Sequence, residues 1–546
     1  MKTSRTPPIR ERSRPGSASA PHATRRGFIL VIILVAVAMI GLGAFTFAEL
    51  MLAENKAVRL HGDEVRLRNA AASAEAWIVD ALERTPDERM HRGGLVDNEE
   101  LFRAIAVGDS ESKDDLLAFS VVSPTRSTTG GVLRFGLENE SAKLNLVALL
   151  ELDRRSPGVA RQALLRLPRM TPAIADALLD WLDDDSSRRE YGAEVDDYRD
   201  AAHGRSPRNG IPPCIEELMF VRGSSPELWY GVDADRNYIP DFPPEAEGPQ
   251  IDGWRRGSED LPWSSLLTLV GAERNATPEG EPRLFLNDPD LAKVHSKLLA
   301  ALGRSVADFV VAYRQYGRIS ASAGNSVTDW RVDTSIPPRH NIEGVLDLVD
   351  AFVEVPLGAN ERGTLRSPLT TDPQSLRETL PRFLDFATTD ARSAIPGRIN
   401  INEAPRDVLR ALPSIGDALA DQIAARQSAE PAESGADSPR RYATWLLVEG
   451  LMDLKQLKTL WPFITCGGDV YRGQIVAFMP SSAMDYRVEV AIDAASRPAR
   501  RLTWKDLRPL GTGFAPDQIG FAESDTTRRE RRGIHWRATH GTTTRM

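Results

Sequence analysis

Cysteine and histidine are scarce in this chain of 546 residues, which contains two cysteines and eight histidines. Two cysteines cannot provide a disulfide scaffold or a cysteine-rich zinc site. The histidines are scattered, and no pair has the spacing that would place two zinc ligands on one predicted helix. Cys214 and Cys466 could form one disulfide in an exported protein, and the sequence leaves open whether they pair.

Catalytic motifs are missing as well. The sequence contains no phosphate-binding loop, no dinucleotide fingerprint and no Gly-x-Ser-x-Gly elbow. We therefore expect no enzymatic activity and assign no catalytic residues.

Basic residues are in deficit over the chain as a whole but not at its start. The whole chain has a formal net charge of −9, but residues 1–27 carry seven basic residues and one acid, which leaves −15 for the remainder. An acidic body argues against bulk binding to nucleic acid or to anionic lipid.

Directly after the basic leader comes an uncharged apolar run of 21 residues, 28–48. At about 1.5 Å per residue, this run as a helix could span the hydrocarbon core of a bilayer, which is about 30 Å thick. Phe45, Thr46 and Phe47 stand where a secretory signal would have a small-residue cleavage site. We expect cleavage between Gly27 and Phe28 instead, which keeps the apolar helix on the mature protein.

The order of charge and hydrophobicity also predicts an orientation. A basic segment before an apolar helix is typical of the cytoplasmic side, so the C-terminal bulk should lie outside. Arg25 and Arg26 resemble a twin-arginine export signal, but the strongly apolar core and the missing cleavage site count against it.

The periodicity of apolar residues predicts the element order. A stripe at three-to-four spacing extends the apolar run into one helix of roughly 55 residues, ended by Pro86. Strands are expected at 117–122 and 131–137, and again at 471–478, 486–492 and 501–504. Residues 486–492 alternate cleanly, which is typical of a strand with one buried and one solvated face. Residues 1–24 and 523–546 have the composition of disordered segments.

A weak internal repeat occupies the middle of the chain. The three copies run over 144–181, 286–314 and 399–426. Each is expected to form an asparagine-capped helix, a tight turn at Pro or Gly and a second helix. Because the spacing differs between copies, we do not expect a solenoid.

Four stretches resemble the type II secretion minor pseudopilin K family (general secretion pathway protein K). They are the leader RRGFILVIILVAVAMIGLG, LLDWLDDDSSRREYGAE at 178–194, IEELMFVRG at 215–223 and GRININEAPRDVLRALP at 397–413. Glu403 departs from the family, which usually has Thr there. The chain is also longer than common members of the family, chiefly around 225–395. The resemblance therefore implies no role for those segments.

The resemblance implies an α+β, pilin-like fold: a long N-terminal helix and a small antiparallel sheet, with a large, mainly helical insertion of helix-hairpin-helix or SAM-like type. The boundaries that we expect are 1–27 (prepilin leader), 28–48 (transmembrane part of the helix), 49–85 (its soluble part), 86–143 (first part of the sheet domain), 144–395 (inserted helical domain), 396–465 (helix-hairpin-helix region), 466–512 (C-terminal strands) and 513–546 (disordered tail).

The resemblance also implies how the leader works. A prepilin peptidase would cut after Gly27 and methylate the new amine of Phe28. Major pseudopilins carry a Glu at mature position 5, whose carboxylate pairs with the amine of a neighbouring subunit. This chain has Ile32 there, and no carboxylate anywhere in residues 28–48. Without this Glu the amine of the neighbouring subunit would be left unpaired in apolar surroundings, which costs roughly several kcal/mol. A subunit that lacks the Glu would therefore be a poor interior member of a fibre.

The implied function is to cap and help initiate a type II secretion pseudopilus. The implied partners are two other minor pseudopilins, the major pseudopilin and the prepilin peptidase. The implied location is the inner membrane, in a single pass with the bulk in the periplasm.

Two acidic stretches are candidate calcium sites, and calcium is the one cofactor that we consider. In the first, Asp233, Asp235, Asn237, the carbonyl of Ile239 and Asp241 follow the spacing of a calcium loop. Tyr238 stands where such a loop has Gly, and Pro244 where it has a bidentate Glu, so a degenerate loop fits about as well. The second cluster contains Asp180, Asp183, Asp185 and Glu194, for which a solvated helix end is the alternative.

A membrane-anchored DNA receptor of the competence type is the alternative function, because it also uses helix-hairpin-helix modules. Such a module needs cations for the phosphates. In the third copy Arg406, Arg410 and Arg426 are outnumbered by acidic residues, with no lysine. We therefore expect no nucleic acid partner.

Overall fold

The structure of the chain is a computed structural model. It describes residues 25–108, 116–124, 133–199, 206–239, 241, 261–320, 327, 330–358, 361–429, 440–479, 484–515 and 517–520. The chain divides into two compact units, Met1–Val65 and Arg66–Met546, which are considered separately.

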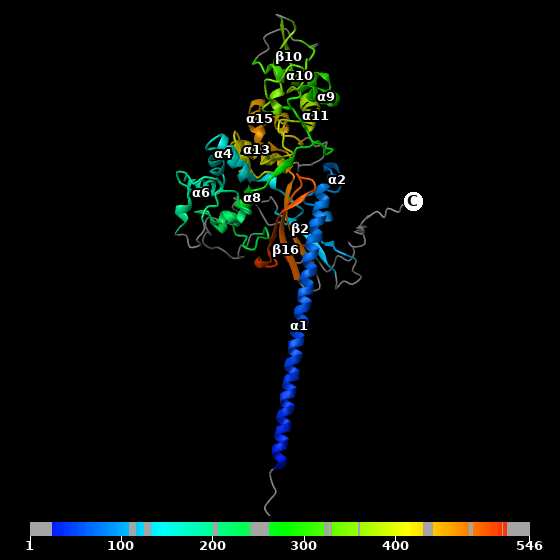
Figure 1. The fold of residues 1–546 in the computed structure, drawn as a ribbon, viewed down its shortest axis with the longest axis vertical. Coiled ribbons are helices and arrows are strands. Elements are labelled where there is room, and N and C mark those ends of the chain that lie inside the picture. Colours follow the sequence, from blue (N-terminus) through cyan, green and yellow to red (C-terminus); the bar gives the residue numbers. More distant parts are fainter. Residues whose placement is uncertain are drawn as a thin grey trace, which may run out of the picture. The chain divides into compact units, whose positions relative to one another are not determined.

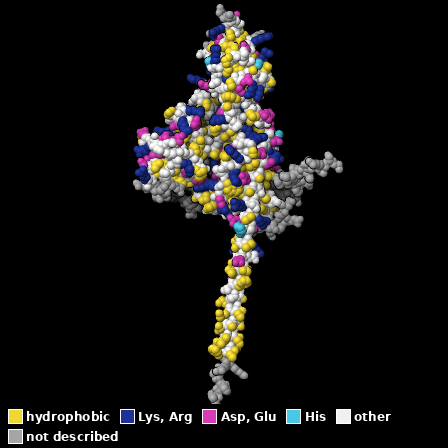
Figure 2. All heavy atoms as spheres, in the orientation of Figure 1, with side chains coloured by type: hydrophobic (Ala, Val, Ile, Leu, Met, Phe, Trp, Pro, Cys, Tyr) yellow, Lys and Arg dark blue, Asp and Glu magenta, His cyan; other side chains and the backbone are white. Residues whose placement is uncertain are grey.

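The described part of the first unit is a single helix, the beginning of α1 (Arg25–Glu83). Residues 28–62 are all exposed, and Figure 2 shows the apolar side chains along this stretch in yellow. By length and composition the stretch can cross a membrane. The long N-terminal helix expected from the sequence is confirmed, and with 59 residues it begins before the expected cleavage point.

The second unit contains an antiparallel sheet in the order β1-β2-β15-β16-β17. Figure 1 labels β2 and β16 of this sheet. These strands are β1 (Ile105–Ala106), β2 (Ala118–Ser123), β15 (Val470–Met479), β16 (Met484–Asp493) and β17 (Arg500–Asp506). Two short strands flank them: β3 (Arg134–Phe135) pairs with β2, and β4 (Glu138–Asn139) pairs with β15. The strands expected at 117–122, 471–478, 486–492 and 501–504 are therefore present, whereas only Arg134–Phe135 of the stretch expected at 131–137 is a strand among the described residues. β2 from the first part of the sheet pairs directly with β15 from the second.

The second half of α1 lies against this sheet. Its buried residues recur at three-to-four spacing and include Ala70, Ala71 and Ala74, whose small side chains allow close approach. The helix ends at Glu83, and Thr85 caps α2 (Pro86–His91) with a capping box and Pro86 at its first turn. A short helix, α3 (Glu99–Phe102), follows. We call residues 66–143 and 466–520 the sheet domain.

The inserted region, residues 144–465, lies between β4 and β15 and has its own hydrophobic core. Its helices of at least five residues are α4 (Leu146–Arg155), α5 (Val159–Leu164), α6 (Pro172–Leu182), α7 (Pro226–Tyr230), α9 (Leu291–Leu302), α10 (Arg304–Tyr316), α11 (Leu380–Phe386), α12 (Arg406–Ala411), α13 (Asp417–Ala429) and α15 (Leu454–Leu460), together with the 3₁₀-helix η4 (Ile215–Phe220) and the π-helix η6 (Ser375–Thr379). Single turns are α8 (Trp263–Leu266), α14 (Trp445–Val448), η3 (Val195–Tyr198), η5 (Val345–Leu348) and η7 (Trp461–Phe463); outside the insertion lie η2 (Glu140–Ala142) and η8 (Arg508–Leu510).

The insertion also contains paired short strands, which the mainly helical expectation did not include. They are β5 (Leu144–Asn145) with β6 (Leu267–Thr268), β7 (Ala272–Arg274) with β12 (Ala394–Pro396), β8 (Leu284–Phe285) with β11 (Ala387–Thr388), β9 (Phe352–Pro356) with β10 (Arg362–Arg366), and β13 (Ile399–Asn400) with β14 (Ile464–Thr465). Most are only two or three residues long, too short for periodicity to reveal them in the sequence.

Three of these pairs give the internal repeat a structural form. Three strand pairs are parallel: β5-β6, β8-β11 and β13-β14. The first strand of each pair lies at or just before the start of one expected copy. The second strand of each pair ends in Thr268, Thr388 or Thr465, whose hydroxyl accepts the backbone N–H two residues later at 3.1, 3.1 and 3.3 Å. The copies are thus closed by equivalent turns. Their interpretation as helix-hairpin-helix units stays a prediction.

The expected asparagine caps are correct in one copy and wrong in two. Asn145 caps α4 by accepting the N–H groups of Val147 and Ala148. Asn287 instead bonds both backbone groups of Ile342, and Asp290 caps α9. α12 follows Pro405 with no side-chain cap. The Asn287 side chain therefore forms hydrogen bonds to a residue distant in sequence instead of capping a helix.

Two further expectations need correction. Phe514 and Ile519 are buried in the core of the sheet domain, so ordered packing continues past the boundary at 513, and residues 521–546 lie outside the described residues. The alternation over 486–492 predicts a solvated face of β16 that would include Arg487 and Glu489, but Arg487 is fully buried and Glu489 is half-buried. The inserted region and the segment after β17 cover that face.

Candidate metal centres and the charge network beside them

The structure brings together three members of the second acidic cluster. Carboxylate oxygens of Asp183, Asp185 and Glu194 all lie within 4.8 Å of one another at the C-terminal end of α6. Asp183 and Glu194 are buried, whereas Asp185 is exposed. The chain reverses after α6, and this reversal returns Glu194 to the helix end.

Asp180 lies beside this group but is already paired. Arg189 Nη1 donates to Asp180 Oδ1 at 2.7 Å and also contacts Asp183 Oδ2. Gly192 packs so tightly on Asp180 that a Cβ there would lie 1.8 Å from Oδ2. One guanidinium therefore pairs with two carboxylates, while among the described residues neither Glu194 nor Asp185 has a cationic partner.

Three carboxylate oxygens in the group are buried without a hydrogen-bond partner among the described residues: Asp183 Oδ1 and both oxygens of Glu194. Burial raises the pKa of Asp183, and burial followed by the charges of Asp180 and Asp183 raises that of Glu194. Buried acceptors without donors are costly. Hard cations such as calcium prefer oxygen ligands, so the residues present fit such an ion.

Other acids near this cluster face elsewhere. Asp184 is exposed and pairs with Arg154 at 3.1 Å. Asp196 pairs with Arg199 at 2.6 Å, and Asp197 caps the backbone N–H of Glu194 at 3.0 Å. They do not belong to the group.

The loop at residues 233–241 also brings its predicted ligands together. Carboxylate oxygens of Asp233, Asp235 and Asp241 lie within 4.8 Å of one another. Asp233 accepts the N–H groups of Asn237 and Tyr238 at 2.9 and 2.8 Å, and Asn237 accepts that of Ile239. The chain therefore curls tightly around the acidic side chains.

Tyr238 does not prevent the sharp turn that its position in the loop requires. It adopts a φ of +68°, the left-handed conformation for which Gly is preferred. Burial, together with the neighbouring carboxylate of Asp235, raises the pKa of Asp233 to about 7. Pro244 and Glu245, which bear on the last ligand position, lie outside the described residues.

The same loop is fastened to the sheet domain through its backbone. Arg487 Nη2 on β16 donates to the carbonyl of Asp235 at 2.6 Å, and Gln474 Nε2 on β15 donates to that of Arg236 at 2.6 Å. Asn237 Nδ2 donates to the carbonyl of Gly513 at 2.6 Å. The loop is thus a point of attachment between insertion and sheet.

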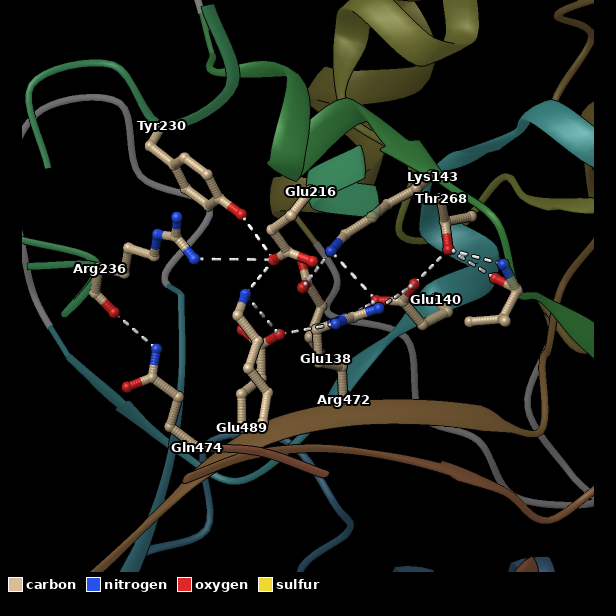
Figure 3. Close-up of polar contacts among 12 residues, drawn as sticks. Glu138, Glu140, Lys143, Glu216, Tyr230, Arg236, Thr268, Arg472, Gln474 and Glu489 are labelled. Carbon is tan, nitrogen blue, oxygen red and sulfur yellow. Dashed lines mark hydrogen bonds and ion pairs between the residues drawn. The ribbon is translucent and has the colours of Figure 1, made fainter. Parts of the chain in front are cut away.

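A network of charged side chains lies beside this loop (Figure 3). Arg472 on β15 donates to Glu140 at 2.7 Å and to Glu489 at 2.8 Å. Lys143 contacts Glu138 at 2.7 Å and Glu140 at 3.1 Å. The two parts of the sheet domain, which precede and follow the insertion, are therefore joined by alternating charges.

Glu216 on η4 extends the network into the insertion. It accepts the hydroxyl of Tyr230 at 2.8 Å, pairs with Arg236 at 3.7 Å and contacts Lys505 on β17. The next residue, Glu217, accepts the indole N–H of Trp181 on α6 at 3.2 Å. Through these neighbouring glutamates η4 connects the acidic cluster of α6 to the sheet.

The carboxylates of this network are strongly stabilised in their charged form. Burial by itself would raise the pKa of Glu140, but the charges of Arg472 and Lys143 lower it to about 2. The pKa of Glu216 is likewise lowered to about 2, against the effect of burial, by Lys505. Sequence reasoning missed this network, because its members are scattered from 138 to 505 and only folding makes them neighbours.

Ile32 is 51% exposed on α1, with no carboxylate in its stretch of helix. Cys214 is exposed and Cys466 half-buried, and both are free, so the structure contains no disulfide between them. Cleavage at Gly27 and methylation of Phe28 stay predictions.

The arginines that a DNA receptor would need are engaged within the chain. Arg406 pairs with Asp421, and Arg410 Nε pairs with Asp417 at 2.6 Å. Arg426 pairs with a glutamate at 2.5 Å. The third copy therefore offers no cluster of arginines without acidic partners, and the DNA-receptor alternative has no support.

Comparison with known proteins agrees with the family resemblance. The family model described as "Type II secretion system (T2SS), protein K" matches residues 142–232, which include the acidic group of α6 and the whole of η4. Over these residues the chain is similar to type II secretion protein K, as expected from its motifs at 178–194 and 215–223. A search of curated proteins found no match.

One solved structure is similar, the GspK-GspI-GspJ complex from the enterotoxigenic Escherichia coli type 2 secretion system. The match has 12% identity and a TM-score of 0.39, and it covers 82% of this chain and 98% of that one. Similarity at this level carries no argument about partners.

Proposed function

We propose that this protein K-like component of a type II secretion system caps the tip of a periplasmic pseudopilus and helps to initiate it. The observation that carries the proposal is the absence of any carboxylate from residues 28–48, with Ile32 at mature position 5. Such a subunit has no counter-charge for the amine of the neighbour whose helix packs against it. It therefore fits one end of a helical stack and not its interior.

The size of the inserted region supports the same placement. Residues 144–465 have their own core, and Glu216 attaches them to the sheet domain through Lys505 on β17. A fibre that repeated this insertion in every subunit would need room for it at each step, whereas a single copy at one end meets no such constraint. The proposed partners are two other minor pseudopilins, the major pseudopilin and the prepilin peptidase. The proposed location is the inner membrane, with the bulk in the periplasm and no enzymatic role.

Ile32→Glu tests the tip assignment. The variant supplies the missing carboxylate, so the protein should be found along pseudopili instead of only at one end. Ile33→Glu is the matched control, because it places the same charge one position, roughly 100°, further around the helix. Both variants bear a similar insertion cost, about 2.5 to 3.5 kcal/mol for a central charge. Immunogold labelling of assembled pseudopili reads out position. If Ile32→Glu stays at one end and secretion is unchanged, the proposal fails.

We also propose that the group of Asp183, Asp185 and Glu194 holds calcium. The partnerless buried oxygens of Asp183 and Glu194 support this group more strongly than the loop at 233–241, whose carboxylates already accept backbone N–H groups. In the loop Asp233, Asp235, Asn237, the carbonyl of Ile239 and Asp241 would be the ligands.

Asp183→Asn and Asp184→Asn form a matched pair for the calcium proposal. The two residues are adjacent, but Asp184 is exposed and lies outside the group. Calcium titration by calorimetry should show one site lost in Asp183→Asn and retained in Asp184→Asn. Equal affinity in both variants and the unmodified protein would exclude this group, and Asp233→Asn would then test the loop.

A further inference from the structure

The acidic group at the end of α6 contains a positive charge of its own, the guanidinium of Arg189. Its partners Asp180 and Asp183 have side chains that are 0% and 7% exposed, so both ion pairs lie in a buried place. The backbone N–H of Arg189 also points to the carboxylate of Asp180, at 3.3 Å from Oδ2. The arginine is therefore held at this position by its main chain as well as by its side chain.

The carboxylate of Asp183 has two different neighbours. Its Oδ2 contacts Arg189, whereas its Oδ1 is buried and has no hydrogen-bond partner among the described residues. Glu194 lies beside it, is 7% exposed, and has both oxygens buried without a partner within the same part of the chain. The guanidinium thus orients Asp183 and leaves one of its oxygens available next to Glu194. Ligands of a bound ion are commonly oriented by such outer contacts.

The charge of Arg189 matters as much as its contacts. The four carboxylates of Asp180, Asp183, Asp185 and Glu194 carry a formal charge of −4, which the guanidinium reduces to −3. The negative end of the α6 dipole adds to this potential. Because the energy of an ion beside a fixed charge is proportional to the charge of the ion, a nearby guanidinium disfavours a trivalent ion more than a divalent one.

We propose that Arg189 positions Asp183 and sets the charge selectivity of an ion site formed by Asp183, Asp185 and Glu194. The inference rests on the calcium proposal above, because it requires an ion at this group. Loss of the guanidinium charge should strengthen the binding of a trivalent ion relative to calcium. An arginine that only supported the local fold would, when removed, weaken the binding of both ions together.

The test compares calcium and lanthanum in calorimetric titrations of the full chain in detergent, at the site that Asp183→Asn abolishes. The measured quantity is the dissociation constant for calcium divided by that for lanthanum. Arg189→Gln should raise this ratio at least about tenfold, and Arg189→Lys, which keeps the charge, should leave it unchanged. Arg188→Gln is the matched control, because the adjacent Arg188 is 57% exposed and pairs with Asp197, outside the group. It should also leave the ratio unchanged.

Asp180→Asn gives an independent test in the opposite direction, which also serves if Arg189→Gln does not fold. It removes a negative charge while Arg189 remains, so the ratio should fall. The double variant Asp180→Asn/Arg189→Gln removes both charges of the buried pair and should return the ratio to that of the unmodified chain. Circular dichroism of each variant checks that folding is intact.

Two results would refute the role of Arg189 while leaving the calcium proposal in place. One is a ratio that stays the same in both Arg189→Gln and Asp180→Asn, and the other is an equal rise in Arg188→Gln. A chain in which Asp183→Asn removes no calcium site would refute the calcium proposal and this inference with it.

Discussion

Arg472 on β15 and Glu140 are 332 positions apart in the chain, yet Nε of the arginine donates to the carboxylate at 2.7 Å. Glu140 is fully buried and stands immediately before the inserted region, which returns to the sheet only at β15. This pair therefore fixes both ends of the insertion to each other. The same glutamate accepts Lys143 and the hydroxyl of Thr268, so its buried charge is fully compensated.

Glu140→Gln should strongly destabilise the junction. It leaves Arg472 and Lys143 with less negative charge in a buried site, and breaking such a pair costs about 3 to 5 kcal/mol. Thermal unfolding of the full chain in detergent should show a lower transition temperature. Glu151→Gln is the control, because Glu151 pairs with Arg155 at 2.9 Å on the surface and should cost less than about 1 kcal/mol. Equal effects of the two changes would contradict the assignment.

The junction should lose stability in acid. The pKa values of Glu140 and Glu216 are about 2 in the folded chain, below the ordinary value of 4.5. A lowered carboxyl pKa contributes stability that is complete above the unfolded value and is lost as the pH falls towards the folded one. The difference in transition temperature between the unmodified chain and Glu140→Gln should therefore be constant from pH 7 to 5 and shrink below about pH 4.5. A difference that does not change with pH would show that Glu140 is not charged.

Gly192→Ala should disturb the acidic group of α6. A Cβ at Gly192 would lie 1.8 Å from Asp180 Oδ2, so either the loop or Asp180 must move, at a cost of about 1 to 3 kcal/mol. At Gly210 a Cβ meets nothing within 4 Å, so Gly210→Ala provides the control. The measurement is the transition temperature of each variant, and an equal effect at both positions would argue against tight packing on Asp180.

Substitution of Gly27 should block maturation. If a prepilin peptidase cuts after this residue, Gly27→Val should leave a precursor that begins at Met1, whereas Gly43→Val within the apolar run should still be cut. N-terminal sequencing of the two purified proteins distinguishes them. A mature protein that starts at Phe28 in both variants would remove the leader assignment.

Local patterns account for what could be predicted. The long helix, the strands at β15 and β16 and the capping role of Asn145 follow from periodicity and local hydrogen bonding, which depend on residues close together in sequence. The acids of the two candidate metal sites were also found this way, because each set falls within a short segment. The failures have one cause: Asn287, Arg487 and Phe514 are placed by partners distant in sequence.

The sequence by itself determined that the apolar segment 28–48 contains no carboxylate, because charge and hydrophobicity follow directly from its residues. It also determined the acidic spacing at 180–194 and 233–241. Only the tertiary structure decided which of those carboxylates are buried without a donor, that Arg487 contacts the insertion, and that Glu489 pairs with Arg472. The physical reason is that the burial and pairing of a side chain depend on residues distant in sequence. These residues come into contact with β15 and β16 only in the folded chain.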